Sequence, residues 1–339
     1  MSGGHGADSE GTVTVPNRNA ALTRFGTVTP GKADIVRVIG YRHQRTINAP
    51  ATVEGVGFIT GSRVRLRFLP AATDTGVAFR RTDLPGSPTV LARAAGVSGT
   101  QRRTTLGQHN TTITLVEHAL ASLAGLRVDN CLVELDGPEP PGLDGSAAGF
   151  VSALAEAGTV TQYARRPIYG PTHPIIVRTP GATLGLHPAP GTELRISYRL
   201  DYGPGAPILP QTHTLAVTPD SFVGEISRCR TFLTEAEAGG LRAQGVGKHL
   251  TGADLLVFGP RGPIDNTVRY ADEPARHKIL DLIGDLALCG FDLAGHVVAY
   301  RSGHSLNVEL ARALACAAAG PEARKPSGRI VGKPAHRAA

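Results

Sequence analysis

One stretch of the sequence combines residue types that could bind a metal ion or move a proton. It spans residues 273–290 and contains His277, Lys278, Asp281 and Asp285. If the stretch is helical, His277, Asp281 and Asp285 follow one another at intervals of about one turn and share a face. Histidine and aspartate at this spacing can bind the same divalent cation. Burying such groups without a partner would cost several kcal/mol per ion, so this face needs one.

The surrounding residues predict that this stretch is a buried helix. Asp272 or Glu273 can cap its start. Pro274 suits the first turn, and Gly290 can end the helix in a left-handed turn. A structural salt-bridge cluster is the alternative to a metal site. The His-x-x-x-Asp spacing by itself favours the salt-bridge cluster. Apolar side chains occupy the opposite face, namely Ile279, Leu280, Ile283, Leu286 and Ala287.

A second predicted helix, over residues 114–125, carries the neighbouring pair Glu117 and His118. Thr114 and Glu117 have the spacing of a capping box, so Glu117 could simply begin the helix. His118 could likewise be a hydrogen-bonded core histidine. Both residues therefore have structural alternatives to a role in chemistry.

The two halves of the chain repeat one order of elements. Each half has strands, a helix with a histidine near its start, another strand, a polar glycine-containing loop and a second helix. We therefore predict two similarly folded α+β domains. If the predicted helices at residues 114–125 and 273–290 face each other, His118 lies close to His277 and Asp281. The strands that we expect are residues 52–57, 63–69, 77–79, 131–135, 174–178, 183–187, 194–200, 214–217, 255–258 and 296–301.

That meeting would bring together two imidazoles and one carboxylate, a usual ligand set for a catalytic zinc with an open fourth position. Glu117, next to His118, could then accept a proton from water as a general base. His304, in a glycine-containing loop after a strand, could donate a proton to a leaving group.

Composition and charge exclude other classes of protein. Aromatic residues make up 5% of the chain and Trp is absent, which argues against a base-stacking platform for nucleic acid. The net charge is +7, of which residues 321–339 contribute +4 through five basic residues and one acid. The weakly basic remainder fits an anionic small-molecule substrate better than a DNA-binding face.

Cysteine usage and hydropathy predict a compartment. The four cysteines have no Cys-x-x-Cys spacing, and Cys131 and Cys289 lie in apolar runs typical of buried free thiols. No signal-peptide pattern and no apolar run of eighteen residues is present, so we expect a cytoplasmic protein without stable membrane insertion. We expect a disordered extension at residues 1–33, domains at 34–164 and 165–318 with a crossing at 165–167, and a basic flexible tail at 319–339.

Five motifs lie in order along the chain, at residues 116–130, 136–147, 227–232, 276–285 and 302–307. They resemble the successive motifs of the UDP-3-O-acyl-N-acetylglucosamine deacetylase (LpxC) family, and the resemblance covers roughly residues 40–315. The resemblance implies a hydrolase that removes acetate from UDP-3-O-acyl-N-acetylglucosamine in lipid A biosynthesis. It also implies two βα two-layer sandwiches packed face to face with the active site between them, and an acyl-chain passage built by an insert at about 232–258.

The resemblance also implies roles for single residues. His118, His277 and Asp281 would bind Zn²⁺, with Fe²⁺ as the alternative metal. Glu117 would be the general base, and His304, held by Asp285, the general acid. The partner would be an acylated UDP-amino sugar and not a nucleic acid, and we expect a monomer. Substrate positioning and oxyanion stabilisation would fall to Lys278 and Thr231, with Phe232 packing on the sugar.

Two departures from the family pattern affect the predicted substrate. Ile59 stands where the family has histidine, in the glycine-rich segment 55–61, and residues 247–254 differ from the usual Gly-Gly-Ser followed by Asn. A diverged relative that deacetylates another acylated amino sugar is therefore an alternative. A non-catalytic, metal-stapled lipid- or nucleotide-binding protein is a second, against which Glu117 and His304 argue, because a structural metal needs neither a base nor an acid.

Overall fold

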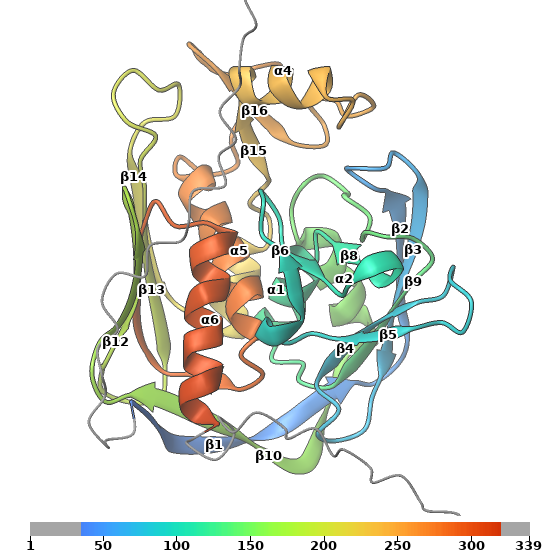
Figure 1. The fold of residues 1–339 in the computed structure, drawn as a ribbon, viewed down its shortest axis with the longest axis vertical. Helices are drawn as coiled ribbons and strands as arrows, with labels where there is room; N and C mark the ends of the chain where they lie inside the picture. The colour runs from blue at the N-terminus through green and yellow to red at the C-terminus, as the bar shows by residue number, and fades with distance from the viewer. Residues whose placement is uncertain (1–34, 320–339) are drawn as a thin grey trace, which may run out of the picture. The chain divides into compact units, whose positions relative to one another are not determined.

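The computed structural model describes residues 35–319. The predicted extension at 1–33 and, apart from residue 319, the predicted tail lie outside the described residues. Two five-stranded sheets flank a set of helices that lie between them (Figure 1). This is the α+β arrangement of two similar two-layer sandwiches that the sequence predicted.

The first sheet has the strand order β2-β3-β9-β4-β5. Only β4 and β9 pair in parallel, and the other neighbours are antiparallel. In β3 the apolar side chains of Val64, Leu66 and Phe68 are buried and alternate with exposed arginines, as expected for a sheet with one covered face. The elements are β2 (Ala51–Val56), β3 (Arg63–Pro70), β4 (Val77–Arg81), β5 (Thr89–Leu91), β9 (Cys131–Leu135), α1 (Glu117–Gly125) and α2 (Ala148–Ala157).

The second sheet repeats this topology. Its order is β11-β12-β19-β13-β14, and again only one pair, β13 with β19, is parallel. In both halves the parallel strand that enters the middle of the sheet follows a helix, and a second helix comes after it. The elements are β11 (Ile175–Thr179), β12 (Ala182–His187), β13 (Leu194–Leu200), β14 (Gln211–Ala216), β19 (Gly295–Tyr300), α5 (Glu273–Ala287) and α6 (His304–Ala318).

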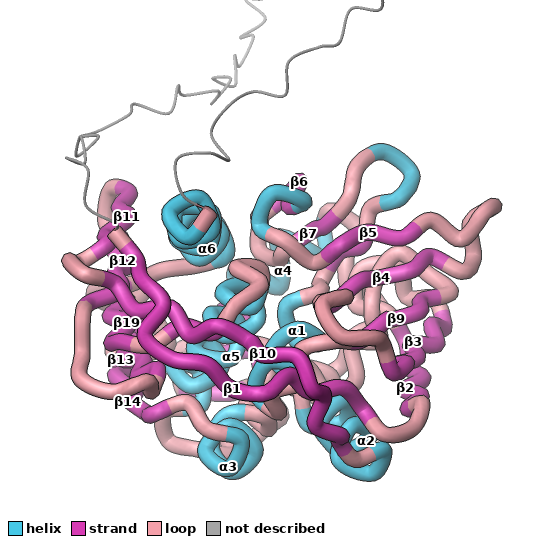
Figure 2. The backbone as a smooth tube through the Cα atoms, turned by 90° about the horizontal axis from the view of Figure 1, so that it is seen from below, coloured by secondary structure: helices cyan, strands magenta, loops and turns pink. Residues whose placement is uncertain are grey.

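A long antiparallel ribbon of β1 (Val36–Ile47) and β10 (Thr159–Pro171) runs beneath both halves (Figure 2). The short strand β18 (Asp292–Leu293) pairs with β10 in parallel. The crossing expected at residues 165–167 falls inside β10. Sequence analysis did not predict either strand of this ribbon.

Each half carries an additional small sheet. In the first half it consists of β6 (Val97–Gly99), β7 (Thr105–Leu106) and β8 (Ile113–Thr114). In the second half it consists of β15 (Phe232–Thr234), β16 (Leu256–Gly259) and β17 (Gly262–Pro263), with α4 (Glu235–Ala243) beside it. Four short helical segments complete the described chain, namely a 3-10 turn at Ala94–Gly96, another at His109–Thr111, α3 (Pro219–Ser221) and the π-helical turn Phe222–Ile226 that follows it.

Helices α1 and α5 pack directly against each other between the two sheets. Gly284 of α5 makes this approach possible, because a Cβ atom added there would lie 2.1 Å from the backbone oxygen of Glu117. Most of α5 is buried, as predicted, with Pro274 in its first turn and Gly290 in a left-handed conformation after its end. Among the described residues, no helix is long and apolar enough to cross a membrane.

One prediction about a helix start is wrong, and a second is confirmed in position only. Helix α1 begins at Glu117 with no side-chain cap, because Thr114 pairs with Thr105 between strands β8 and β7 instead of capping a helix. Asp272 occupies the cap position of α5 but makes no capping bond, since its carboxylate pairs with Arg276 and His213. His304 also differs from expectation, because it is the first residue of α6 and not part of a loop.

Candidate metal centre and active site

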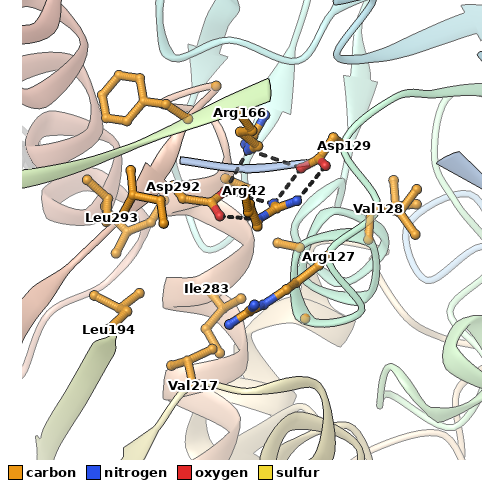
Figure 3. A pocket seen from close by; sticks show the side chains of 18 of the residues that line it. Arg42, Arg127, Val128, Asp129, Arg166, Leu194, Val217, Ile283, Asp292 and Leu293 are labelled. Carbon is orange, nitrogen blue, oxygen red and sulfur yellow. Dashed lines mark hydrogen bonds and ion pairs between the residues drawn. The ribbon is translucent and has the colours of Figure 1, made fainter. Parts of the chain in front are cut away.

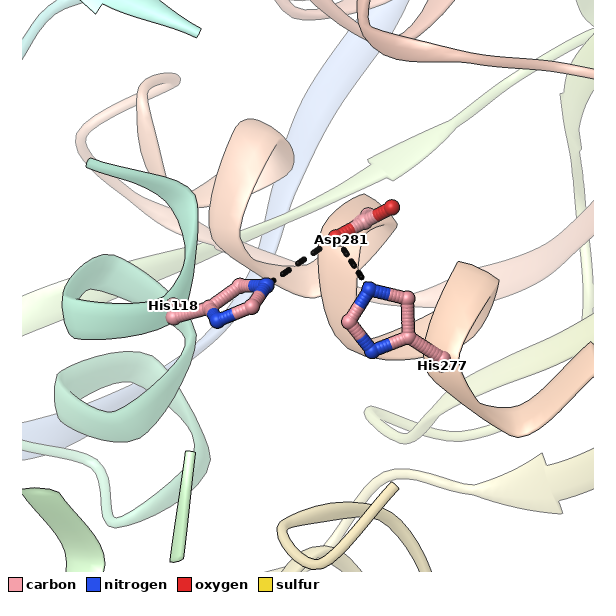
Figure 4. Close-up of side chains that lie close together, drawn as sticks. All are labelled: His118, His277 and Asp281. Atoms are coloured by element: carbon pink, nitrogen blue, oxygen red, sulfur yellow. Dashed lines mark ion pairs between the residues drawn. The ribbon is translucent and has the colours of Figure 1, made fainter. Parts of the chain in front are cut away.

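His118 of α1 faces His277 and Asp281 of α5 across the helix interface (Figure 4). The Nε2 atoms of His118 and His277 lie 3.6 Å and 3.4 Å from the same carboxylate oxygen, Oδ1 of Asp281. One ligand atom from each residue lies within 4.8 Å of the others, and no other such cluster of three occurs in residues 35–319. Two imidazole nitrogens and one carboxylate oxygen at these separations could hold a single metal ion.

Neighbouring groups orient these three side chains. The Nδ1 atom of His277 lies 3.0 Å from the backbone oxygen of Cys229. As the donor in that bond it leaves Nε2 free to bind a metal, and burial lowers the pKa of His277 to about 4, which favours the neutral ring. Burial alone would raise the pKa of Asp281, but the positive charge of Lys278 lowers it well below its ordinary value. His277 and Asp281 are therefore held as a neutral imidazole and a charged carboxylate.

A second cluster lies beside the first. Glu117 Oε2 accepts a hydrogen bond of 3.1 Å from the backbone N–H of Thr104, and burial raises the pKa of Glu117 above its ordinary value. The Nε2 atom of His304 lies 3.9 Å from Glu117 Oε1, and its Nδ1 lies 2.9 Å from Asp285 Oδ2. Asn307 donates a further bond to Asp285, at 2.9 Å.

The charge on His304 follows from these neighbours. Burial alone would lower the pKa of His304, but the carboxylates of Asp285 and Glu117 raise it to about 9. Its ring is thus protonated at neutral pH and faces a buried carboxylate. A protonated imidazole beside a carboxylate is the pairing that general acid–base chemistry requires.

Lys278, Thr231 and Phe232 also lie at this site. Lys278 Nζ donates to Asp281 Oδ2 at 2.7 Å, and although burial alone would lower the pKa of Lys278, Asp281 raises it overall. Thr231 Oγ1 donates to the backbone oxygen of Gly145 and lies 3.4 Å from His277 Nε2. The ring of Phe232 lies edge-on to that of His277, with the centroids 5.9 Å apart.

Eight of the predicted site residues line one cavity of about 470 Å³, namely Glu117, His118, Thr231, Phe232, His277, Lys278, Asp281 and His304, while Asp285 lies behind His304. Three contributors were missed in the sequence. Tyr202 and Arg301 line the cavity, and Thr104 holds both Glu117 and Asp285. All three come from loops, where no periodicity marks a residue as facing the site.

Comparison with known proteins shows the family to which the chain belongs. A family model described as "LpxC: UDP-3-O-acyl N-acetylglycosamine deacetylase" matches residues 44–316. A UDP-3-O-acyl-N-acetylglucosamine deacetylase of Nostoc sp. is 39% identical over 275 residues, covering 80% of this chain and 98% of the relative. The chain belongs to the UDP-3-O-acyl-N-acetylglucosamine deacetylase family.

Further members of the deacetylase family are similarly close. The protein of that name from Thermosynechococcus vestitus is 39% identical over 272 residues, with 80% of this chain and 94% of the relative covered. A bifunctional enzyme LpxC/FabZ from Chlorobaculum tepidum is 34% identical over 303 residues, covering 80% of this chain and 64% of that protein. The family resemblance predicted from five motifs is confirmed.

In this member of the deacetylase family, the two segments in which the sequence analysis expects departures from the family pattern meet in space. The backbone N–H of Ile59 donates to Glu139, and its side chain lines a smaller cavity of about 120 Å³. His249, from the other departing segment, places Nε2 2.9 Å from the backbone oxygen of Gly57, and its ring lies against Gly61. A histidine of the predicted insert therefore contacts the turn that contains Ile59.

Proposed function

We propose that this protein is a Zn²⁺-dependent amide hydrolase that removes acetate from UDP-3-O-acyl-N-acetylglucosamine in lipid A biosynthesis. The observation that carries the proposal is the position of Glu117 and His304 beside the His118, His277 and Asp281 cluster, in one cavity. The family membership of the chain and the names of its relatives support this substrate.

The candidate metal ligands would hold Zn²⁺, with Fe²⁺ as the alternative. Once bound by His118, His277 and Asp281, the metal would supply Lewis-acid activation of water and of the amide carbonyl. The fit rests on the shared Asp281 oxygen and on the bond from His277 to Cys229, which leaves the correct nitrogen free.

The proton transfers are assigned to Glu117 and His304. Glu117 accepts a proton from the attacking water as a new bond forms between the water oxygen and the acetyl carbon. His304 donates its proton to the amide nitrogen as the carbon–nitrogen bond breaks, which yields acetate and a free amine. Asp285 fixes the orientation of His304 by accepting a hydrogen bond from its Nδ1 atom. Asn307 in turn holds Asp285 by donating a hydrogen bond to the same carboxylate.

Three further groups complete the proposed reaction site. Lys278 holds one oxygen of Asp281, lines the cavity and would stabilise negative charge on the acetyl oxygen. Thr231 would hold the substrate beside His277, and Phe232 offers an apolar ring face on which a sugar can pack.

The smaller cavity suits the acyl chain. Its lining is mostly apolar and combines Ile59 and Leu115 of the first half with residues of the insert, including Leu233, Leu241 and Val257. Thr231 and Leu233 line both this cavity and the larger one, so the two cavities adjoin at these residues. An acyl chain could therefore leave the reaction site along the insert, away from water.

A diverged relative that acts on another acylated amino sugar is the second candidate. The contact of His249 with the turn that contains Ile59 favours it, because both departures from the family pattern alter the same edge of the substrate cavities. Such a relative would use the same metal and acid–base groups, so only its substrate would differ.

Mass-spectrometric measurement of acetate release from UDP-3-O-acyl-N-acetylglucosamine tests the proposal. The zinc-loaded protein should release one acetate per sugar, and a chelator should stop the reaction until zinc is restored. No turnover by zinc-loaded, folded protein would refute the proposed substrate. Turnover of another acylated amino sugar in the same assay would establish the diverged relative instead.

A further inference from the structure

A second cavity lies at the far ends of α1 and α5 from the candidate metal ligands. Its volume is about 430 Å³, close to that of the candidate active site, and no residue lines both. Its walls come from the last turns of α1 and α5, from the ribbon of β1 and β10, and from β18. Both halves of the fold therefore contribute to a site that the proposed deacetylation does not use.

Two of the four arginines that line this cavity are neutralised by carboxylates. Arg42 Nη2 lies 2.6 Å from Asp129 Oδ1, and Arg166 Nε lies 2.6 Å from Asp292 Oδ1. Arg42 also pairs with Asp292, and Arg166 with Asp129, so the four side chains form a closed network (Figure 3). Asp129 and Asp292 therefore each pair with both Arg42 and Arg166.

The other two arginines, Arg93 and Arg127, have no acidic partner within residues 35–319. The only hydrogen bond from the Arg93 side chain is one of 3.3 Å to the backbone oxygen of Ala92, and the Arg127 side chain makes none in this part of the chain. Each guanidinium has five N–H donors, so most of them are unused. Arg93 is half-buried, and burial together with the nearby charge of Arg166 lowers its pKa.

These arginines do not cap the helix ends beside them. The carbonyl ends of both helices point toward this cavity and would attract positive charge. However, the backbone oxygen of Ala124 already accepts from the N–H groups of Leu126 and Arg127, and that of Leu288 accepts from Ala94. Arg127 instead extends from the end of α1 toward Ile283 of α5 (Figure 3).

We propose that this cavity binds a small phosphorylated anion through Arg93 and Arg127. Guanidinium groups bind phosphate oxygens in pairs of parallel hydrogen bonds, and a phosphate would use the donors that the protein leaves free. The hydroxyl-bearing residues Tyr41, Thr192 and Thr218 line the same cavity. The four arginines face three carboxylates there, since Glu193 joins the two of the network, which leaves a net charge of +1 for the anion to balance.

Titration with inorganic phosphate tests this site in the zinc-loaded, full-length protein. Binding is followed by calorimetry at constant ionic strength, set with potassium chloride. Arg127→Gln is the main variant, because Arg127 is exposed and its loss leaves no buried group unpaired. Two arginines serve as controls, Arg195, exposed on β13 without an ion pair in the described chain, and Arg301, which lines the candidate active site.

The wild-type protein should bind phosphate, and Arg127→Gln should weaken that binding by about tenfold or more, while its melting temperature without phosphate stays unchanged. Arg93→Gln should weaken binding as well. Arg195→Gln and Arg301→Gln should bind as the wild type does. The proposal fails if Arg127→Gln binds phosphate as tightly as the wild type. It also fails if Arg195→Gln weakens binding equally, or if only Arg301→Gln does so.

Discussion

The Asp281 carboxylate divides its two oxygens between different tasks. Oδ1 faces both imidazoles, and Oδ2 accepts a hydrogen bond from Lys278 Nζ. This division keeps one oxygen available for a metal and fixes the rotation of the side chain. Lys278 also balances the negative charge of a group that is almost completely buried.

Glu117→Gln separates chemistry from structure at the residue scale. Glutamine can still accept the hydrogen bond from Thr104, so the variant should keep its melting temperature and its bound metal. It cannot accept a proton, so kcat should fall by about 10²–10⁴. A melting curve, metal analysis and steady-state kinetics on the same preparation decide the matter. Unchanged kcat would show that Glu117 has a structural role only.

His249 and Ile59 give a second prediction at this scale. His249 anchors the insert to the turn through Gly57, while Ile59 faces an apolar cavity. His249→Ala should therefore raise KM for a long-chain substrate more than it lowers kcat, because the metal and its base are distant from the change. Ile59→His should not improve KM, since it places a polar ring in the apolar cavity. Lower KM in Ile59→His would show instead that the family's histidine contact is missing here.

The residues of the site were predictable where they lie on helices. His277, Asp281 and Asp285 recur at helical spacing, so their common face follows from the sequence. Thr104, Tyr202 and Arg301 were not predictable, because loops bring them to the cavity over long sequence separations. The assigned roles of the predicted residues remain proposals that the kinetic variants test.

At the scale of elements, the contact between α1 and α5 depends on a missing side chain. A Cβ atom at Gly284 would overlap the backbone of Glu117, and backbone cannot move aside as a flexible side chain can. The residue next to this contact is His118, so the spacing of the two helices sets the separation of the proposed metal ligands.

Gly284→Ala should therefore destabilise the protein by about 1–3 kcal/mol, the usual cost of overpacking, and weaken metal binding. Gly239→Ala in α4 is a matched control, because it is also helical but has no atom within 4 Å of an added Cβ. That control should stabilise the protein by about 0.5–1 kcal/mol. Urea unfolding of both variants gives the comparison. Equal stability of the two would contradict the close approach of α1 to α5.

Element boundaries were predictable where proline and glycine mark them, as Pro274 and Gly290 do for α5. The capping box was wrong for a tertiary reason. Thr114 pairs with Thr105 in a small sheet, and this pairing overrides the local preference for a helix start. Sequence spacing alone cannot distinguish these outcomes, because the partner strand determines which one occurs.

At the scale of the whole molecule, the two halves share one topology and are joined by the β1–β10 ribbon. The repeat was predictable from the order of helices and loops. The ribbon was not, since its register pairs Val36 with Pro171 and Ile47 with Thr159 over more than a hundred residues. Such pairing leaves no local pattern in the sequence.

The network of Arg42 and Arg166, on the ribbon, with Asp129 and Asp292 predicts how the stability of the fold depends on pH. Burial alone would raise the pKa of Asp292, but Arg42 and Arg166 lower it overall. Between this lowered pKa and the ordinary value near 4, the unfolded chain binds more protons than the folded one. Asp292 therefore stabilises the fold fully above about pH 5, and this contribution declines as the pH falls below about 4.

Asp292→Asn should reduce stability by about 1–3 kcal/mol at pH 7 and flatten the decline between about pH 5 and pH 3. Asp220→Asn is the control, because Asp220 is exposed and forms no ion pair in the described part of the chain. Urea unfolding across this pH range measures both. A slope as steep in Asp292→Asn as in the wild type would show that other carboxylates determine the acid sensitivity.

The most direct test of the central claim is a zinc titration of the metal-free protein, with acetate release from UDP-3-O-acyl-N-acetylglucosamine as the readout. Activity should rise linearly and reach a plateau at about one zinc per chain, because His118, His277 and Asp281 form one site. Asp281→Ala should bind zinc much more weakly, and its activity should not reach a plateau at about one zinc per chain. Full activity without metal, or unchanged zinc binding and activity in Asp281→Ala, would contradict the account.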